Sequence, residues 1–339
     1  MGCEKAWWYS KGAKKEQAER ITRKGNGCDD PHTQRVGRVV ILPAMNIDLP
    51  NYAIDRKPFE GEVIDVMGGS ARWEIKVQNH GLVALVDVMP RLAPVGKTAD
   101  FAIVQAARVS YGEGTKKVSE DRGLIRYLAR HRHTTPFEMV EFKFHHVMPI
   151  FVARQWIRHR TANVNEYSAR YSVVPDRFFR PSVENIRRQS KSNRQGGDEP
   201  IDEATAAEFL AYLDDVEKHY AAYEQLMDKG VARELARIVL PVSVYTEWYW
   251  KCDLHNVFHF LSLRMDPHAQ QEIRDYANAM FALIQPIVPI AAEAFLDYNL
   301  GGAHLSRLEI DALRSGQPLA TENKREQSEW EEKKKRLGL

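Results

Sequence analysis

Alternation of apolar and polar residues between positions 140 and 145 constrains the fold of this chain more than any other pattern. Val140, Phe142 and Phe144 are separated by charged or polar side chains, which predicts a strand with one buried face. Residues 82–86 form a short apolar run, and residues 242–250 alternate again. Both segments are therefore also predicted to be strands.

Helical spacing of apolar residues dominates the rest of the middle of the chain. Pro149 suits the first turn of a helix that runs through residue 160. Residues 187–203 are polar and are predicted to form a loop. The chain contains no GxGxxG or Walker loop, so a doubly wound nucleotide-binding fold is not expected. The pattern predicts a helix-rich α+β fold, with further helices at 209–227 (closed by Gly230), 231–240, 254–264 and 267–285.

Composition divides the chain into three parts. Residues 1–80 are predicted to be an N-terminal extension that is partly disordered, because 10–38 are rich in Lys, Arg, Gly and Gln. Residues 81–300 carry the regular patterns and are predicted to form the folded domain. Residues 301–339 are predicted to form a charged C-terminal helix or tail.

Charge and cysteine content limit the classes of partner. The chain has 48 basic and 46 acidic residues, a balance that argues against a nucleic-acid coat. No apolar run approaches the ~20 residues of a membrane span, so neither nucleic acid nor a membrane is an expected partner. The three cysteines, at 3, 28 and 252, are odd in number and widely spaced, so a disulfide framework is not expected and a cytoplasmic setting is predicted.

The segment Arg154–Ser172 concentrates positive charge. It holds four arginines and one acid, Glu166, which gives +3 over 19 residues. On the predicted helix, Gln155, Arg158 and His159 have the spacing i, i+3, i+4 and share one face. Arginine forks match phosphate oxygens, so this segment predicts a binding site for an anionic ligand.

Beyond the predicted helix, Glu166, Ser168 and Arg170 alternate with period 2. An extended segment would project these three side chains to one side, where the carboxylate can accept from a ring N–H or a ribose hydroxyl. The alternative is a basic helix face with a salt bridge to Glu166. The absence of lysine from the segment favours the ligand site.

Histidines mark the segment 253–264. His255, His259 and Ser262 recur at i, i+4 and i+7, and two histidines at this spacing can bind zinc. Asn256 follows the first histidine, so the general base of an H-E-x-x-H motif is missing, and no metal site is predicted. Packing between helices and contact with a bound cofactor both remain open. Arg264 closes this helix, where its guanidinium can point into a cleft.

Two smaller groups could also serve a ligand. Arg233 and Arg237 share a helix face at i, i+4, which is unfavourable unless an anion or an acid such as Glu234 lies between them. His131, His133 and Thr135 alternate just before a turn. The two histidines of this second group could bind a metal ion as a pair, or they could be ordinary hydrogen-bonding side chains.

Taken together, these residues resemble the flavin-dependent thymidylate synthases. The signature of that family, Arg-His-Arg followed by seven residues and Ser, reads here Arg158-His159-Arg160 and Ser168. The flanks agree in order: HRHTTPFE before the signature, then RYS, VARELARIVLP and HNVFHFLSLRMDPHAQQEIRDYA after it. The resemblance covers residues 81–300.

The resemblance implies a reaction and a fold. The family makes dTMP from dUMP with a one-carbon unit from 5,10-methylenetetrahydrofolate, and FAD reduced by NADPH supplies the hydride. The implied fold is α/β, a single catalytic domain with a small mixed or antiparallel sheet. The implied assembly is a homotetramer whose active sites lie between subunits.

The resemblance also implies site residues. The flavin would be bound by Thr135, Arg158, His159, Arg160, Glu166, Asp253, His255 and His259. Among these, Asp253 stands where other members carry Asn. The nucleotide would be bound by Gln155, Arg158, Glu166, Ser168, Arg170, Arg237 and Arg264.

Arg264 is the expected catalytic residue. Carbon 5 of the uracil must become nucleophilic, and negative charge then develops toward N3 and O4. A fixed guanidinium there stabilises the transition state more than the ground state. Cys252 lies at the end of an apolar strand, where a buried thiol is common, and it is not expected to act as a nucleophile. A single-stranded nucleic-acid binder and a metal-dependent hydrolase are the alternatives from other classes.

Overall fold

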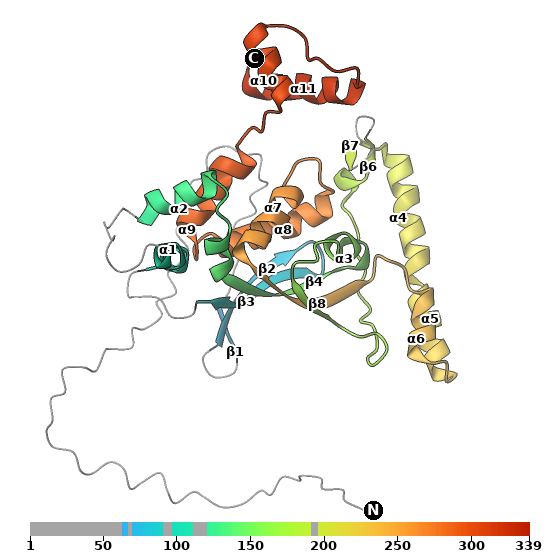
Figure 1. Ribbon diagram of the computed structural model, residues 1–339. Coiled ribbons are helices and arrows are strands. Elements are labelled where there is room, and N and C mark those ends of the chain that lie inside the picture. The colour runs from blue at the N-terminus through green and yellow to red at the C-terminus, as the bar shows by residue number, and fades with distance from the viewer. Residues whose placement is uncertain (1–62, 67–69, 91–96, 111–120, 191–195) are drawn as a thin grey trace, which may run out of the picture. The chain divides into compact units, whose positions relative to one another are not determined.

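A computed structural model describes residues 63–66, 70–90, 97–110, 121–190 and 196–339 (Figure 1). All of them belong to Arg38–Leu339, the larger of the two compact units into which the chain divides. The disorder predicted at 10–38 and most of the predicted N-terminal extension lie outside the described residues.

Within the described ranges, six strands form one antiparallel sheet in the order β1-β2-β3-β4-β8-β5. The strands are β1 Val63–Val66, β2 Ser70–Val77, β3 Gly81–Met89, β4 Glu141–Pro149, β5 Asn163–Glu166 and β8 Tyr245–Asp253. The strands predicted at 82–86 and 140–145 are confirmed in β3 and β4, and the one predicted at 242–250 begins three residues later. A helix-rich chain with a small antiparallel sheet confirms the predicted fold class.

The sheet begins before residue 81. β2 pairs with β3 and places Trp73 opposite Leu85, and Trp73 and Ile75 pack against the main core. Residues 73–77 alternate apolar and charged side chains, a strand pattern that the prediction of an extension over 1–80 overlooked. The limits of the domain otherwise stay a prediction.

One face of the sheet is buried under helices. Phe142 and Phe144 of β4 and Trp250 of β8 are at most 1% exposed, and Phe144 pairs with Trp250 across the strands. Figure 1 shows α3 Ile150–Trp156, α7 Leu254–Arg264 and α8 Gln271–Ile284 on this side of the sheet. Trp156 of α3 stacks on Phe260 of α7, with ring centroids 4.4 Å apart, so the sheet and both helices share one core.

Close approach fixes the position of α8 against β3. The hydroxyl of Tyr276 donates to the carbonyl of Val147, 2.9 Å away. A Cβ at Gly81 would overlap that hydroxyl. The start of β3 therefore requires glycine, and α8 can lie directly on the sheet.

A second group of helices covers the end of the core near β3. It consists of α1 Asp100–Val109, α2 Asp121–Arg130, α9 Pro289–Phe295 and the π-helix Leu296–Leu300. Asp100, 3% exposed, accepts from the backbone N–H groups of Ile290 and Ala291 at 2.8 and 3.1 Å. This carboxyl therefore caps the first turn of α9.

Helices α4 Glu203–Glu217, α5 His219–Asp228 and α6 Arg233–Ala236 follow the hairpin of β6 Arg187–Gln189 and β7 Gly197–Pro200. The hairpin lies in the segment predicted to be a loop. The single helix predicted at 209–227 is divided at Lys218, and it ends, as expected, at Gly230, whose φ is +85°. Helix α6 is shorter than predicted, because Arg237–Val239 continue as a 3-10 turn, labelled η3.

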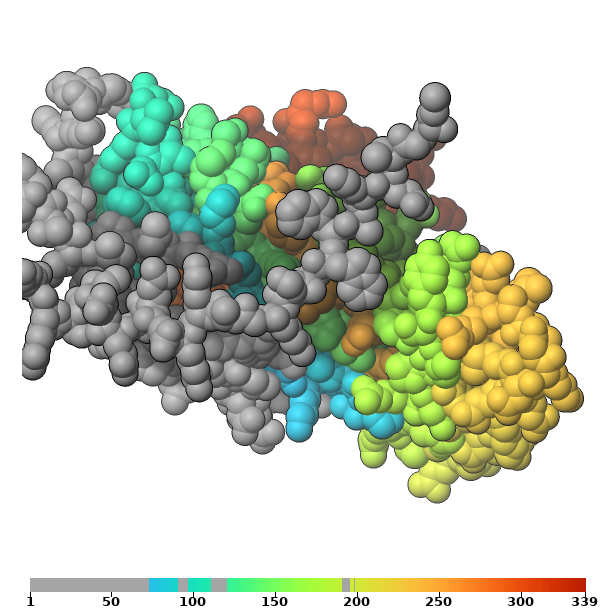
Figure 2. All heavy atoms as spheres, turned by 90° about the horizontal axis from the view of Figure 1, so that it is seen from below, coloured from blue at the N-terminus to red at the C-terminus, as the bar shows by residue number. Residues whose placement is uncertain are grey.

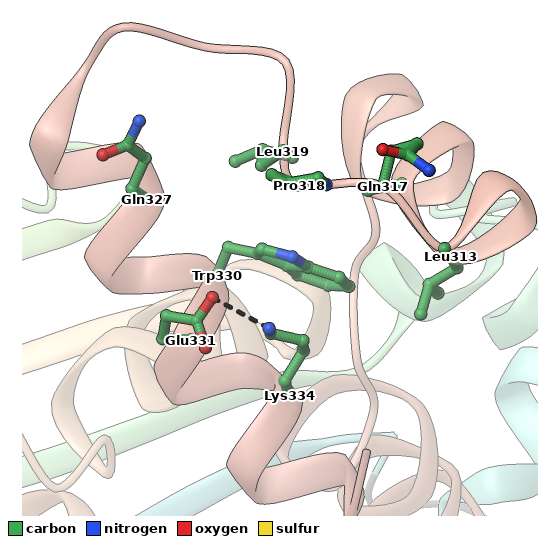
Figure 3. Close-up of a pocket in the computed structure, with 10 residues that line it drawn as sticks. Leu313, Gln317, Pro318, Leu319, Gln327, Trp330, Glu331 and Lys334 are labelled. Atoms are coloured by element: carbon green, nitrogen blue, oxygen red, sulfur yellow. Dashed lines mark ion pairs between the residues drawn. The ribbon is translucent and has the colours of Figure 1, made fainter.

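The segment 301–339 forms two helices, α10 Arg307–Ser315 and α11 Lys324–Leu337. Ser306 and Glu309 form a capping box at the start of α10. Between the two helices lies a pocket of about 620 Å³ around Trp330 and Leu313 (Figure 3). None of the predicted site residues lines this pocket. No helix of the described ranges is long and apolar enough to cross a membrane.

Candidate active site

Arg264 and His159 are joined by a hydrogen bond between segments that are 105 residues apart. Arg264 is the last residue of α7, and His159 lies just after α3. The Nε of Arg264 donates to Nε2 of His159 at 3.1 Å. Phe260, one turn before Arg264, packs edge-on against the His159 ring with centroids 4.9 Å apart. Two separate sequence signals therefore form one structural unit.

The protonation state of His159 follows from its surroundings. Burial, and then the positive charge of Arg264 and the neighbouring His259, lower the pKa of His159 to about 4. The imidazole is therefore neutral at physiological pH. Because Nε2 accepts from Arg264, the ring proton lies on Nδ1.

Arg264 is a half-buried cation. Burial lowers its pKa, and none of the described carboxylates forms an ion pair with it. One of its five N–H donors is used by His159, and the other donors remain available. A guanidinium in this state is suited to stabilising negative charge that develops on a bound ligand.

Helix α3 is shorter than the sequence predicts. It ends at Trp156, and the N–H of Ile157 donates to the carbonyl of Ala153. Arg158 and His159 therefore lie in a turn rather than on one helix face with Gln155, because the chain must reverse before it can pair as β5. The amide of Gln155 donates instead to Gln270, at the start of α8.

The arginines around this turn are free for a ligand. Arg154, Arg158 and Arg160 are exposed. Within the part of the chain that the structure describes, their side chains make no hydrogen bond or ion pair. Unpaired guanidinium groups fit the phosphates of a nucleotide and a dinucleotide.

Glu166 ends β5 and has one hydrogen-bond partner among the described residues. The hydroxyl of Thr246 on β8 donates to Oε1 of Glu166 at 2.8 Å. No described arginine forms a salt bridge with Glu166. The alternative of a basic helix face with a salt bridge to Glu166 is therefore wrong for the described residues. The carboxylate is held by a neutral donor and keeps its second oxygen for other partners.

The extended segment stops at Glu166. Ser168 and Arg170 lie in the following turn, where the N–H of Arg170 donates to the Ser168 hydroxyl at 3.3 Å. The Nε of Arg170 pairs with Glu234 of α6 at 3.0 Å. The period-2 argument therefore does not extend past Glu166, because the chain turns away from the sheet edge.

The arginine pair of α6 is divided between two roles. Arg233 donates to the carbonyl of Tyr171 at 2.9 Å. Glu234 pairs with Arg170, which leaves the exposed Arg237 without an ion-pair partner among the described residues. Arg237 is therefore available for an anion.

The remaining predicted flavin contacts are scattered around the start of α7. Both carboxylate oxygens of Asp253 cap that helix, through the backbone N–H and the side-chain amide of Asn256 at 3.0 and 2.8 Å. His255 is half-buried, and His259 and Thr135 are exposed. The described residues contain no cluster of three metal-ligating side chains.

Three rings gather beside Thr135. Tyr127 lies 4.4 Å from His131 and 6.0 Å from His133, measured between ring centroids. The two histidines therefore contact a tyrosine of α2, which favours ordinary packing and hydrogen bonding over a metal pair.

The predicted site residues fall into two groups within one chain. In the first group, His159 lies between Arg264 and His259, since it accepts a hydrogen bond from Arg264 and its ring lies edge-on to that of His259 with centroids 6.0 Å apart. In the second, Arg170 is tied to α6 through Glu234, Ser168 lies in the same turn as Arg170, and Arg237 follows α6 directly. Figure 1 shows α6 to one side of α7. No hydrogen bond between described residues joins the two groups.

Cys252 is a buried thiol. Burial raises its pKa well above the ordinary value, and the carboxylates of Asp253 and Glu141 act in the same direction. Its Sγ donates to the carbonyl of Thr161 at 3.1 Å. A thiol in this state is not a nucleophile.

Three residues of the site were missed by the sequence analysis: Thr246, Phe260 and Gln270. Thr246 lies in the alternating segment 242–250, and Phe260 lies in the predicted helix 254–264. The sequence places Thr246 in a predicted strand and Phe260 in a predicted helix. It does not indicate that Thr246 would contact Glu166 or that Phe260 would contact His159. Gln270 had no signal beyond its place near the start of a helix.

Comparison with known proteins decides the family. The family model described as "Thymidylate synthase complementing protein" matches residues 91–290. This range contains every predicted site residue. A flavin-dependent thymidylate synthase of Dictyostelium discoideum is 68% identical over 290 residues, which cover 86% of this chain and 96% of that protein. The chain belongs to the flavin-dependent thymidylate synthase family.

Other relatives agree. A flavin-dependent thymidylate synthase of Thermus thermophilus is 56% identical over 241 residues, which cover 71% of this chain and 84% of that protein. The crystal structure of a UMP/dUMP methylase, PolB, from Streptomyces cacaoi with 5-Br dUMP superposes with a TM-score of 0.57 at 34% identity. The match covers 66% of this chain and 98% of that one. The predicted family, fold class and enzyme class are thereby confirmed.

Proposed function

We infer that this chain makes dTMP from dUMP by reductive methylation, with the one-carbon unit from 5,10-methylenetetrahydrofolate and the hydride from NADPH through FAD. Membership of the family supports the reaction. The observation that carries it to particular residues is the half-buried Arg264 guanidinium, which has no carboxylate partner among the described residues and is oriented by neutral His159.

The chemistry of the donor set fits both the nucleotide and the flavin cofactor. The exposed Arg158, Arg160 and Arg237 have no described ion-pair partner and can bind phosphates bidentately. Glu166 offers a free carboxylate oxygen for a ring N–H or a ribose hydroxyl. When bound, reduced FAD supplies the hydride that completes the methyl group.

Arg264 performs the activation of the substrate. Carbon 5 of the uracil must become nucleophilic before it can bond to the one-carbon unit, and in this activation negative charge develops toward O4 and N3. The unused N–H donors of Arg264 stabilise this charge in a half-buried position, where the interaction is stronger than in water. His159 holds Nε, so the orientation of the guanidinium is set before the reaction.

The remaining assignments follow the two groups. Asp253 caps α7, which carries His255 and His259, and Thr135 begins a separate 3-10 turn. These four residues are proposed to contact the flavin together with Arg158, His159, Arg160 and Glu166. Gln155, Ser168, Arg170 and Arg237 are proposed to bind the nucleotide. Both carboxylate oxygens of Asp253 already accept hydrogen bonds from Asn256. Its contact with the flavin would therefore be made by a carboxylate that also caps α7.

A homotetramer with sites between subunits is proposed, and two observations support it. The nucleotide residues near α6 and those at Arg264 form separate groups, between which no hydrogen bond of the described residues runs, and a second copy could bring the two groups together in one site. In addition, α4 and α6–η3 expose large apolar side chains, among them Tyr212 at 60% and Ile238 at 73%. Helices α5 and α6 lie in the yellow surface at the right of Figure 2. Light scattering of the purified protein measures the assembly, and an active monomer would contradict shared sites.

The activity is tested with the purified full chain. We expect a flavin absorption spectrum and dTMP formation that requires dUMP, methylenetetrahydrofolate and NADPH together. Omitting each in turn gives the matched controls. A colourless protein whose activity is lost with a chelator would instead indicate the metal-dependent hydrolase, and high affinity for single-stranded nucleic acid would indicate the binding protein.

A further inference from the structure

We propose that Thr246 is a positioning residue, which orients the carboxylate of Glu166 toward the bound nucleotide and flavin. The proposal rests on the proposed function, because it assigns Glu166 to that site. It adds a residue that the signature of the family does not contain, since Thr246 lies 80 positions away on another strand.

The pairing of β5 with β8 brings the two residues together. Glu166 lies opposite Trp248, and Thr246 is two residues before Trp248 on the same face of β8. Side chains on one face at this diagonal offset are within reach of a long side chain. The Thr246 hydroxyl meets Oε1 of Glu166 at 2.8 Å.

Thr246 and Glu166 differ in burial and in their place in the sheet. Thr246 is 9% exposed and belongs to β8, which pairs with β4 along its whole length, Met148 lying opposite Thr246. Glu166 is exposed and ends the edge strand β5. A free glutamate side chain samples many rotamers, so a donor on a rigid strand restricts the carboxylate to fewer orientations.

The hydrogen bond also determines which oxygen is available. Oε1 is occupied by the hydroxyl, and Oε2 has no partner among the described side chains. The donor is neutral, so it orients the carboxylate without cancelling its charge. The backbone N–H of Tyr167 donates to the carbonyl of Glu247 at 2.8 Å, which anchors the end of β5 next to the same pair.

Matched substitutions separate the hydroxyl of Thr246 from its volume. Thr246→Val keeps the shape and removes the donor, whereas Thr246→Ser keeps the donor and removes a methyl group. If the hydroxyl positions Glu166, Thr246→Val lowers kcat/KM for dUMP by about tenfold, the effect of one hydrogen bond to a charged group. Thr246→Ser then stays close to wild type. If Thr246 only fills space, the order of the two variants is reversed.

Binding measurements provide a second readout that does not need turnover. Dissociation constants for dUMP and FAD are measured through the flavin spectrum in wild type, Thr246→Val, Glu166→Ala and the double variant. Positioning predicts that Thr246→Val weakens dUMP binding in wild type and changes it by less than about twofold in Glu166→Ala. Equal losses in both backgrounds would overturn the proposal.

The outcomes are distinguishable. A Thr246→Val variant with wild-type kinetics and affinity overturns the positioning role and leaves the proposed function intact. A wild-type protein that binds neither dUMP nor FAD overturns the proposed function itself. If Thr246→Val lowers the melting temperature strongly, Thr246→Ala serves as a second variant without the hydroxyl. Thr246→Ala must then also leave dUMP binding nearly unchanged when it is combined with Glu166→Ala.

Discussion

Replacing Arg264 by alanine tests the centre of the proposed mechanism. The structure assigns the side chain one hydrogen bond, from Nε to His159, and no ion pair within the described chain. The substitution therefore leaves no described carboxylate unpaired. Its effect on catalysis comes from the donors that would meet the substrate, and its effect on the free protein comes from the lost bond to His159.

The size of the effect follows from this arrangement. Removing one fixed donor at a developing oxyanion costs about 100- to 1,000-fold in rate, or about 2.7–4 kcal/mol. Burial lowers the pKa of Arg264, which means that the folded protein disfavours this charge. We therefore expect Arg264→Ala to lose at least about 100-fold in kcat, with no large loss in melting temperature.

The assay is dTMP formation at saturating dUMP, together with flavin content and light scattering. Arg314 lies in the last turn of α10, as Arg264 lies in the last turn of α7, so Arg314→Ala is the matched control and should behave as wild type. Arg264→Lys keeps the charge without the planar fork and should recover only part of the rate. Turnover of Arg264→Ala within about threefold of wild type would refute the role given to this residue.

Three further predictions concern other parts of the molecule. Ser168→Ala should weaken dUMP binding more than FAD binding, because its hydroxyl lies in the turn with Arg170; spectroscopic titration that shows a selective loss of FAD would contradict this. Cys252→Ser should keep substantial activity, since burial holds the thiol protonated, and an inactive variant that folds and binds FAD would argue for a thiolate mechanism. Burial raises the pKa of Asp100 to about 6 from 3.8, so the folded state binds this proton more tightly than the unfolded state. Its contribution to stability is therefore lost as the pH rises from about 4 to about 6. Urea melts should show the free energy of unfolding of wild type falling relative to Asp100→Asn by up to about 3 kcal/mol over that range; a difference that does not change with pH would show the direction to be wrong.

The sequence by itself determined the local elements of the centre of the fold. Alternation predicted β4, because one face of a half-buried strand must be apolar. Apolar spacing predicted α7 with its bounds, Leu254–Arg264. The signature Arg158-His159-Arg160 and Ser168, together with its flanking segments in the same order, identified the family.

The tertiary structure decided where the elements end and which side chains meet. The predicted helix runs through residue 160, but α3 ends at Trp156 because the chain must turn to pair β5 with β8. The composition of residues 1–80 predicted an extension, and β2 was therefore missed. The short alternation at 73–77 forms a strand because β3 pairs with it. Local periodicity carries no information about a contact between positions 105 or 80 apart in the chain. The pairing of Arg264 with His159, and of Glu166 with Thr246, therefore depends on how the helices and strands pack, because only packing brings residues so far apart in the chain into contact.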